Sequence, residues 1–406
     1  MPARRRMVAA AALLTPLLVA PLAGPAATAA PSAAPLASSI AVDWQRTAAR
    51  TIYVERGTPV PVAALYMSFT SLAVHDAATE AQRHGTHAAA AAVAVAAHDV
   101  LLEYFPLSAA GLDADLVTSL AMVPDGKKEE AGVAIGAAAA DEMIASRVGD
   151  GRGDTSVVYT KSAGLGIWPA APVPGGMAFA WLGFVDPVVD VKPVTLDGPD
   201  PITSTAYAKD YEEVRLLGSV DSAARTPEQT AISLFFAPSA PLMYRTALCD
   251  LLDAEPLGLQ PTTRLFARID AAIATTLIET WRLKYEVGFW RPFQAVAAAG
   301  IDGNAGTNPH PVAWVPLVTN PAYSDYTSGH AAGTSPFAEV LRRTFGDATP
   351  LVLRLGAVTR EYTTLTALEH DALHARIWGG LHFRDAMDDG YHLGHTTAQQ
   401  VMKAIH

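Results

Sequence analysis

The sequence predicts an all-α protein built from one or more helical bundles. Half of its 406 residues are hydrophobic. Long stretches repeat apolar residues at spacings of three and four, the period of a helix with one buried face. There is no alternation of strand and helix patterns and no glycine-rich dinucleotide loop, so a doubly wound α/β sheet is not expected. Two stacked bundles, an N-terminal block at 43–200 and a C-terminal bundle at 201–406, fit this length.

The first 29 residues have the composition of a secretory signal peptide. Three arginines at positions 4–6 precede an apolar run, and Ala-Thr-Ala at positions 27–29 is a small-residue cleavage site. The alternative is a membrane anchor, but the run is short for a span and contains two prolines. We therefore expect secretion of a mature chain that begins at Ala30. A flexible leader at 30–42 and no stable membrane association are expected as well.

Charge and cysteine content narrow the classes of partner. The formal net charge is −11, which argues against nucleic acid or an anionic membrane as the main partner. The same negative field makes any local cluster of lysine and arginine informative. The single cysteine, Cys249, cannot form an internal disulfide, and we expect it to be a small buried residue rather than a catalyst.

The N-terminal half predicts a helical block followed by an irregular excursion. Apolar periodicity predicts four helices, at 63–83, 88–105, 112–122 and 128–148. Residues 155–203 are rich in glycine and proline and keep no period, which predicts a long excursion with room for short strands.

The C-terminal half predicts further helices. Their expected positions are 206–217, 265–287, 330–345 and 352–374, with another helix after His382. Thr226, followed by proline and an acid, is typical of a helix start. Gly288 predicts the end of the helix at 265–287, and 302–325 predicts a Pro/Asn/Gly loop.

Three short stretches of this half carry candidate anion-binding groups. In the first, Lys284 and Arg291-Pro292 are seven residues apart, so both cations would project from one side if the helix continued to Trp290. The ordinary alternative is a pair of surface cations whose alkyl stems lie along an apolar face.

The second stretch, Ser328-Gly329-His330, closes the loop and opens a helix. Backbone N–H groups at a helix start point outward with the positive end of the helix dipole, which favours an anion. Gly329 allows close approach, Ser328 adds a hydroxyl and His330 an acid–base group. The alternative is an ordinary serine N-cap with an incidental histidine.

The third stretch contains Arg376 and His382, separated by Gly379 and Gly380. The planar guanidinium of Arg376 suits two oxygens of a tetrahedral anion. Taken alone, His382 is more often a hydrogen-bonded core histidine than a catalyst.

Together the stretches read Lys-x6-Arg-Pro, Ser-Gly-His and Arg-x5-His, in this order over about 100 residues. This pattern resembles the superfamily of type 2 phosphatidic acid phosphatases, bacterial acid phosphatases and vanadium-dependent haloperoxidases, and the helical bundles expected above would then be of that type. Thr327 and Ala375 replace a usual proline and serine. Position 386 is alanine where an acid commonly follows the last histidine, so Asp385 or Asp388 is expected to orient His382.

The resemblance implies a role for each of these residues. Lys284, Arg291 and Arg376 would neutralise the oxyanion, with Ser328 and the Gly329 amide as further donors. His382 would bond to the phosphorus or vanadium through Nε2, and His330 would act as general acid–base.

The same residues would serve two activities. A phosphatase needs no cofactor; it would act on phosphate esters, with His382 as nucleophile and His330 protonating the leaving alkoxide. A haloperoxidase would hold vanadate at His382, and His330 would help deprotonate hydrogen peroxide so that a halide is oxidised to a hypohalous equivalent. Trp281, three residues before Lys284, and Tyr323, seven before His330, resemble the halide or substrate pocket of the haloperoxidase branch. We therefore expect a haloperoxidase.

Two other classes remain open from the sequence. His370 and His374 lie four apart on one helix face, near the spacing of a zinc hydrolase, with His392 and His395 downstream. Surface or second-sphere histidines are the ordinary reading. A secreted helical binding protein with a decayed site is the non-enzymatic alternative, against which the intact motif argues.

Overall fold

The computed structural model describes residues 33–238 and 240–406. Residues Ala33–His406 form one compact unit. Helices make up nearly all of its regular structure, and the described sheet has two strands. The prediction of an all-α protein is confirmed. The expected signal peptide at 1–29 lies outside the described residues.

Among the described residues, the N-terminal block contains the four predicted helices, with ends shifted by up to three residues, and four further helical elements that were not predicted. Together, in chain order, they are α1 (Ala33–Ala49), η1 (Arg50–Glu55), α2 (Val60–Ala81), η2 (Gln82–His84), α3 (Thr86–Tyr104), η3 (Pro106–Ser108), α4 (Ala109–Leu120) and α5 (Lys127–Ser146). Helix α3 is rich in alanine and packs very closely against α5. A side chain at Gly132 or Gly136 would overlap the α3 backbone at Ala88 and Ala92, which explains glycine at these helical positions.

The expected flexible leader is wrong from residue 33 onward. Helix α1 begins at Ala33, and Ala37, Ile40 and Ala41 are buried. These apolar residues have helical spacing and continue into Trp44, whose Nε1 donates to Ser119 Oγ at 3.1 Å. Burial of this stripe holds the segment against the core.

The segment at 155–203 is irregular, as predicted, and its short helix is η4 (Ala180–Phe184). It packs against the end of the long helix α9 (Leu259–Val287). Lys161 Nζ donates to the carbonyls of Glu286 and Val287 at 2.6 and 2.9 Å, and Trp281 Nε1 donates to Ala178 O at 3.1 Å. The excursion therefore caps the end of α9, where Lys284 lies.

The C-terminal half supplies the remaining elements. Besides α9 they are α6 (Thr205–Leu217), α7 (Pro227–Phe235), α8 (Ala240–Ala254), α10 (Pro292–Ala297), α11 (Gly329–Phe345), β1 (Leu351–Leu355), β2 (Val358–Tyr362), α12 (Leu365–Trp378) and α13 (Arg384–Ala404). Thr226 caps α7 in a reciprocal capping box with Gln229. Gly288 ends α9 with φ of 62°, in the left-handed region that favours glycine. Both predicted boundaries are confirmed.

The single helix expected at 352–374 is wrong. An antiparallel hairpin, β1–β2, occupies residues 351–362, and α12 starts only after Thr364, which caps it. Leu351 and Leu353 are both buried, so the apolar period at this point is two rather than 3.6.

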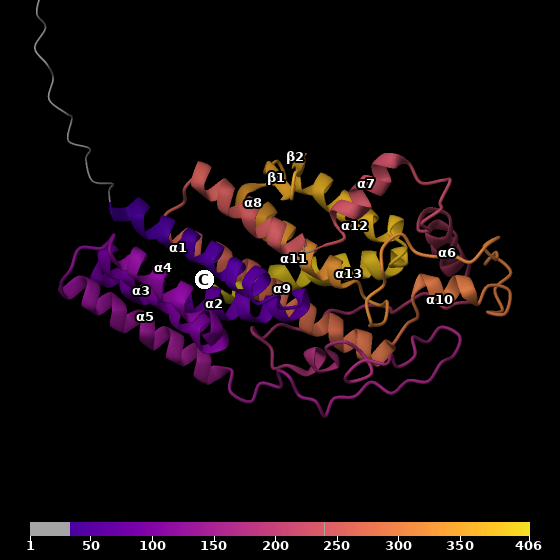
Figure 1. Cartoon of the computed structure of the whole chain (residues 1–406), viewed down its shortest axis with the longest axis horizontal. Helices are drawn as coiled ribbons and strands as arrows, with labels where there is room; N and C mark the ends of the chain where they lie inside the picture. The colour runs from indigo at the N-terminus through magenta and orange to yellow at the C-terminus, as the bar shows by residue number, and fades with distance from the viewer. Residues whose placement is uncertain (1–32, 239) are drawn as a thin grey trace, which may run out of the picture. The chain divides into compact units, whose positions relative to one another are not determined.

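Helix α9 lies in the middle of the described unit and packs against α1, α2, α11 and α13 (Figure 1). One hydrophobic cluster joins residues of α1, α2 and α3 to residues of α8, α9, α11 and α12. The expected division near residue 200 is therefore not a boundary in packing.

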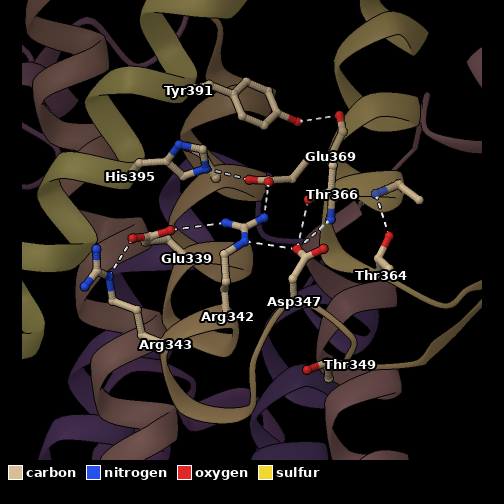
Figure 2. Close-up of polar contacts among 12 residues, drawn as sticks. Glu339, Arg342, Arg343, Asp347, Thr349, Thr364, Thr366, Glu369, Tyr391 and His395 are labelled. Atoms are coloured by element: carbon tan, nitrogen blue, oxygen red, sulfur yellow. Dashed lines mark hydrogen bonds and ion pairs between the residues drawn. The ribbon is translucent and has the colours of Figure 1, made fainter.

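A polar network ties α11, α12 and α13 together (Figure 2). Arg342 on α11 donates to Glu339 at 3.1 Å, to Asp347 at 3.1 Å and to Glu369 on α12 at 2.5 Å. Glu369 also contacts His395 Nε2 on α13 at 2.6 Å. These three helices carry or adjoin Ser328, His330, Arg376 and His382, so the network fixes the elements that position the site.

No single described helix is long and apolar enough to cross a membrane. The helical segments Thr86–Tyr104 and Pro106–Leu120 together have the length and apolar composition of a membrane span, but they meet at a bend of 118°.

Candidate oxyanion site

Lys284 lies in the last turn of α9 and is completely buried. Its Nζ donates to the carbonyls of Ser324 and Asp325, both at 2.9 Å. Ser324 Oγ donates back to Lys284 O at 2.8 Å, so the loop before α11 is attached to the end of α9. Burial and the nearby Arg291 hold the pKa of Lys284 well below its usual value.

Arg291 does not continue α9, because Gly288 ends that helix; it precedes α10 as its N-cap residue. The side chain is completely buried. Nε donates to Tyr323 O at 2.9 Å, and Nη1 donates to Leu381 O at 2.7 Å and approaches His382 Nε2 at 3.1 Å. The guanidinium of Arg291 thus joins its own segment to Leu381, 90 positions further along the chain.

Ser328 and Gly329 form the start of α11. Ser328 Oγ accepts from Ala331 N at 3.4 Å as a helix cap, and its own hydroxyl proton remains available for donation. Gly329 lies against Trp281, whose ring would be 3.3 Å from an added Cβ. The close approach expected of Gly329 therefore places the helix start next to this indole.

His330 follows on the first turn of α11. Burial, together with the charges of Arg376 and Arg291, lowers the pKa of His330 well below its ordinary value. The imidazole is therefore neutral near pH 7 and can accept a proton.

Arg376 lies in the last turn of α12 and is 4% exposed. Its Nη1 donates to Phe236 O at 3.3 Å. Burial lowers the pKa of Arg376 to about 9, which still leaves the group charged at neutral pH.

His382 is 2% exposed and lies between Arg291 and Asp325. A guanidinium only donates, so Nε2, which faces Arg291, must be an acceptor. The proton of the neutral ring is therefore on Nδ1, which is 2.7 Å from Asp325 Oδ1. This contact is off the line of an aligned hydrogen bond. The Nε2 lone pair points toward the cations, where a ligand or nucleophile is needed.

The acid beside His382 was predicted wrongly. Asp385 accepts from Asp200 N at 3.1 Å, and Asp388 has Arg384 and Glu213 as charged neighbours. The carboxyl at Nδ1 belongs to Asp325, and burial raises its pKa to about 7. Asp385 and Asp388 lie at the start of the helix after His382, whereas Asp325 lies in the loop before α11. Its position directly before Tyr326-Thr327-Ser328 was the signal that could have identified it.

The charges at this site do not balance. Lys284, Arg291 and Arg376 are buried basic side chains, and among the described residues Asp325 is the buried carboxyl whose charge acts on both Lys284 and Arg291. Nη2 of Arg291 and Nε of Arg376 are buried without a hydrogen-bond partner among the described residues. Buried charges and donors of this kind require compensation. A tetrahedral oxyanion would supply both negative charge and acceptors.

Trp281 and Tyr323 meet beside this cluster, with ring centroids 5.1 Å apart. Lys284 Nζ and Arg291 Cζ each lie 5.0 Å from the centroid of Tyr323. Both rings also line a cavity of about 210 Å³ that reaches His330. The structure thus brings the two aromatic residues together next to the cations.

The histidine pair at His370 and His374 has other partners. His374 Nδ1 donates to His370 O at 2.7 Å, and its Nε2 contacts Arg384 at 3.1 Å. Among the described residues no group of three or more His, Cys, Asp or Glu side chains is arranged to hold a metal ion.

A family model described as the VCPO second helical-bundle domain matches residues 264–406. No curated protein matches in sequence. Solved structures with a similar fold include the first bacterial vanadium-dependent iodoperoxidase, at 19% identity and a TM-score of 0.70. That match covers 92% of this chain and 97% of the other.

The apo and holo forms of a bacterial vanadium-dependent chloroperoxidase are similar as well. Both are 15% identical to this chain, with TM-scores of 0.65 and 0.64. The matches cover 85% and 86% of this chain, and 93% and 92% of the others. At these identities the likeness establishes the fold. The chain therefore has the fold of these bacterial vanadium-dependent peroxidases, and its residues 264–406 match the family model of the VCPO second helical-bundle domain.

Proposed function

We propose that this protein is a vanadate-dependent haloperoxidase that oxidises a halide with hydrogen peroxide. The observation that carries the proposal is the cluster of three buried cations around His382, with unpartnered donors on Arg291 and Arg376. Vanadate fits this set, because it is a tetrahedral oxyanion that accepts several hydrogen bonds and one histidine nitrogen. When bound, it supplies the Lewis acidity that activates peroxide toward a halide.

The residues of this chain would divide the remaining work. His382 would hold the oxyanion through Nε2, because its proton is on the Nδ1 side that faces Asp325. Lys284, Arg291 and Arg376 would neutralise the oxygens of the bound anion, since the three side chains bring basic groups into a buried site. His330 would take a proton from hydrogen peroxide, because the depressed pKa keeps its ring neutral.

A phosphatase is the alternative, and the lowered pKa of His382 gives it specific support. An imidazole that stays neutral and presents Nε2 to the cations is also suited to attack a phosphate monoester through a phosphohistidine. The meeting of Trp281 and Tyr323 at a cavity beside His330 favours the haloperoxidase.

One experiment separates the two activities. The apo-protein is incubated with orthovanadate, hydrogen peroxide and bromide, and bromination of a phenolic dye is followed by absorbance. Hydrolysis of p-nitrophenyl phosphate is measured in parallel without vanadate, and His382→Ala serves as the inactive control for both. We expect vanadate-dependent bromination. Phosphate hydrolysis without bromination would establish the alternative.

A further inference from the structure

The cavity beside His330 has a mostly apolar and aromatic wall. It is enclosed by α2, α8, α9 and the start of α11, and none of the described residues lining it is Asp, Glu, Lys or Arg. Proline, alanine and aliphatic side chains make up most of the wall. Aromatic rings are contributed by Trp281, Tyr323 and Tyr244. Cations lie behind Tyr323 at one end of the cavity. The rest of the wall offers no charge to compensate an ionised ligand for its lost hydration, so this part of the cavity favours a neutral occupant.

The polar groups in this wall are largely satisfied within the protein. Tyr244 Oη and Thr334 Oγ1 bond to each other at 3.0 Å. Trp281 Nε1 donates to the carbonyl of Ala178 at 3.1 Å. His330 and Tyr323 are the lining residues that connect the cavity to the oxyanion site, and His330 contributes the acid–base group.

The size of the cavity fits a single aromatic ring. Its volume is about 210 Å³, whereas an apolar cavity of about 150 Å³ in another protein stays dry and binds benzene. A substituted ring would fill the space, and the neighbouring indole and phenol rings would favour it through edge or offset contacts.

We propose that this cavity binds the organic acceptor of the reaction, a neutral single-ring aromatic of the size of phenol, and holds it beside His330. The inference rests on the proposed haloperoxidase function, which supplies the oxidant. The oxygen–oxygen bond of hydrogen peroxide breaks as the halide gives up two electrons and bonds to one of the oxygens, and with one proton from the solvent the products are a hypohalous acid and water. A ring carbon then forms the carbon–halogen bond as the halogen–oxygen bond breaks. The ring loses its proton, which combines with the departing hydroxide to give water.

Gly333 offers a position on the cavity wall from which a larger side chain would fill the space. It lines the cavity from α11, and the nearest heavy atom to an added Cβ is Pro241 Cγ at 3.8 Å, an ordinary contact. Leucine is also a better helix former than glycine, so Gly333→Leu should fold. The matched control is Gly111→Leu on α4, an exposed position with nothing within 4 Å of the added Cβ.

The first measurement is binding of phenol to the apo-protein by ligand-observed NMR, with neither vanadate nor peroxide present. We expect Gly333→Leu to weaken binding roughly tenfold or more, because the new side chain removes the contact surface of the ring. Gly111→Leu should bind phenol like the wild type. Equal binding by all three proteins would overturn the cavity assignment, whatever the enzymatic activity.

The second measurement is the ratio of ortho- to para-bromophenol formed by the vanadate-loaded protein, compared with free hypobromite. We expect the wild type to differ from free hypobromite and Gly333→Leu to match it.

The two arms fail in different ways. A wild-type isomer ratio equal to that of free hypobromite refutes halogenation in the cavity and leaves the haloperoxidase intact. Absence of any vanadate-dependent bromide oxidation refutes the proposed function, and the binding arm then still decides whether the cavity takes an aromatic ring.

Discussion

His382 Nδ1 lies 2.7 Å from Asp325 Oδ1. The carboxyl comes from the loop before α11, and the same aspartate accepts from Lys284 through its backbone oxygen. Asp325 therefore faces His382 with its side chain and accepts a hydrogen bond from Lys284 with its main chain. The geometry makes Asp325 the group that fixes the tautomer and direction of the imidazole.

Replacement of Asp325 by asparagine should weaken vanadate binding and turnover together. Asn has the same shape and keeps the backbone contact with Lys284, but it removes the charge that favours a proton on Nδ1. Loss of such a partner costs roughly 10- to 100-fold in affinity or activity. Equilibrium vanadate binding and steady-state bromination test this.

Asp388→Asn is the matched control, because this aspartate lies on α13 beside Arg384. It should stay within about twofold of wild type, as expected for a carboxyl without contact to the site. Equal losses in both variants would mean that Asp325 has no special relation to His382.

Orthovanadate and phosphate should each stabilise the apo-protein. The site holds more buried positive than negative charge, so an anion that binds the folded state alone raises the free energy of unfolding. The gain is about 2.7 kcal/mol at a hundredfold excess over Kd. Thermal unfolding with and without each anion measures this as a rise in Tm.

Arg376→Met should abolish most of that rise, because it removes a buried cation with an unpartnered Nε. Arg354→Met is the control: Arg354 is half exposed and pairs with Asp250 on the surface. An unchanged anion-dependent rise in Arg376→Met would exclude Arg376 from the binding site.

Removal of Arg342 should destabilise the protein more than removal of its neighbour Arg343. Arg342 joins Glu339, Asp347 and Glu369 and is 24% exposed, whereas Arg343 is 49% exposed and bonds to Glu339 alone. Arg342→Met removes the cation that Glu339 and Glu369 share, leaves each of these poorly solvated carboxyls with weaker pairing, and should cost about 1–3 kcal/mol. Arg343→Met should cost less than about 1 kcal/mol. Urea unfolding decides the matter, and equal costs would contradict a structural role for this network.

Helix caps and helix ends could be predicted from the sequence, because they depend on residues that are neighbours in the chain. The capping box at Thr226 and the glycine stop at Gly288 were both visible in the sequence and are present. The hairpin at 351–362 was misread, because a short apolar run fits either period and its burial depends on tertiary contacts.

Relations across the chain could be predicted only in part. The motif order indicated that Lys284, Arg291, Arg376 and His382 act together, and the structure shows three separate segments meeting there. The motif order could not show that Arg291 lies outside α9. Nor could it show that the carboxyl next to His382 belongs to a residue 57 positions earlier, since both features depend on how the loop before α11 folds back. Asp325 was missed for that physical reason.

His330 and His382 should have different roles, which alanine variants can distinguish. Both rings have a pKa depressed by burial and by the neighbouring cations, but only His382 has a nitrogen at 3.1 Å from Arg291 and a carboxyl at its other nitrogen. His382→Ala should therefore lose both turnover and most vanadate affinity, because the bond to the oxyanion itself is removed. His330→Ala should keep much of the affinity, since the three cations and His382 remain. Its rate should fall on the order of 10²- to 10⁴-fold, the usual contribution of a positioned general base.

The pH–rate profile supplies a second readout of the same division. A base must be deprotonated to act, so wild-type activity should decline on the acid side as the His330 ring takes up a proton, and this limb should be absent from His330→Ala. Vanadate binding and steady-state rates are measured on both variants across this range. If His330→Ala loses binding as completely as His382→Ala, or keeps its full rate, His330 is not the base and the assignment of the two histidines is wrong.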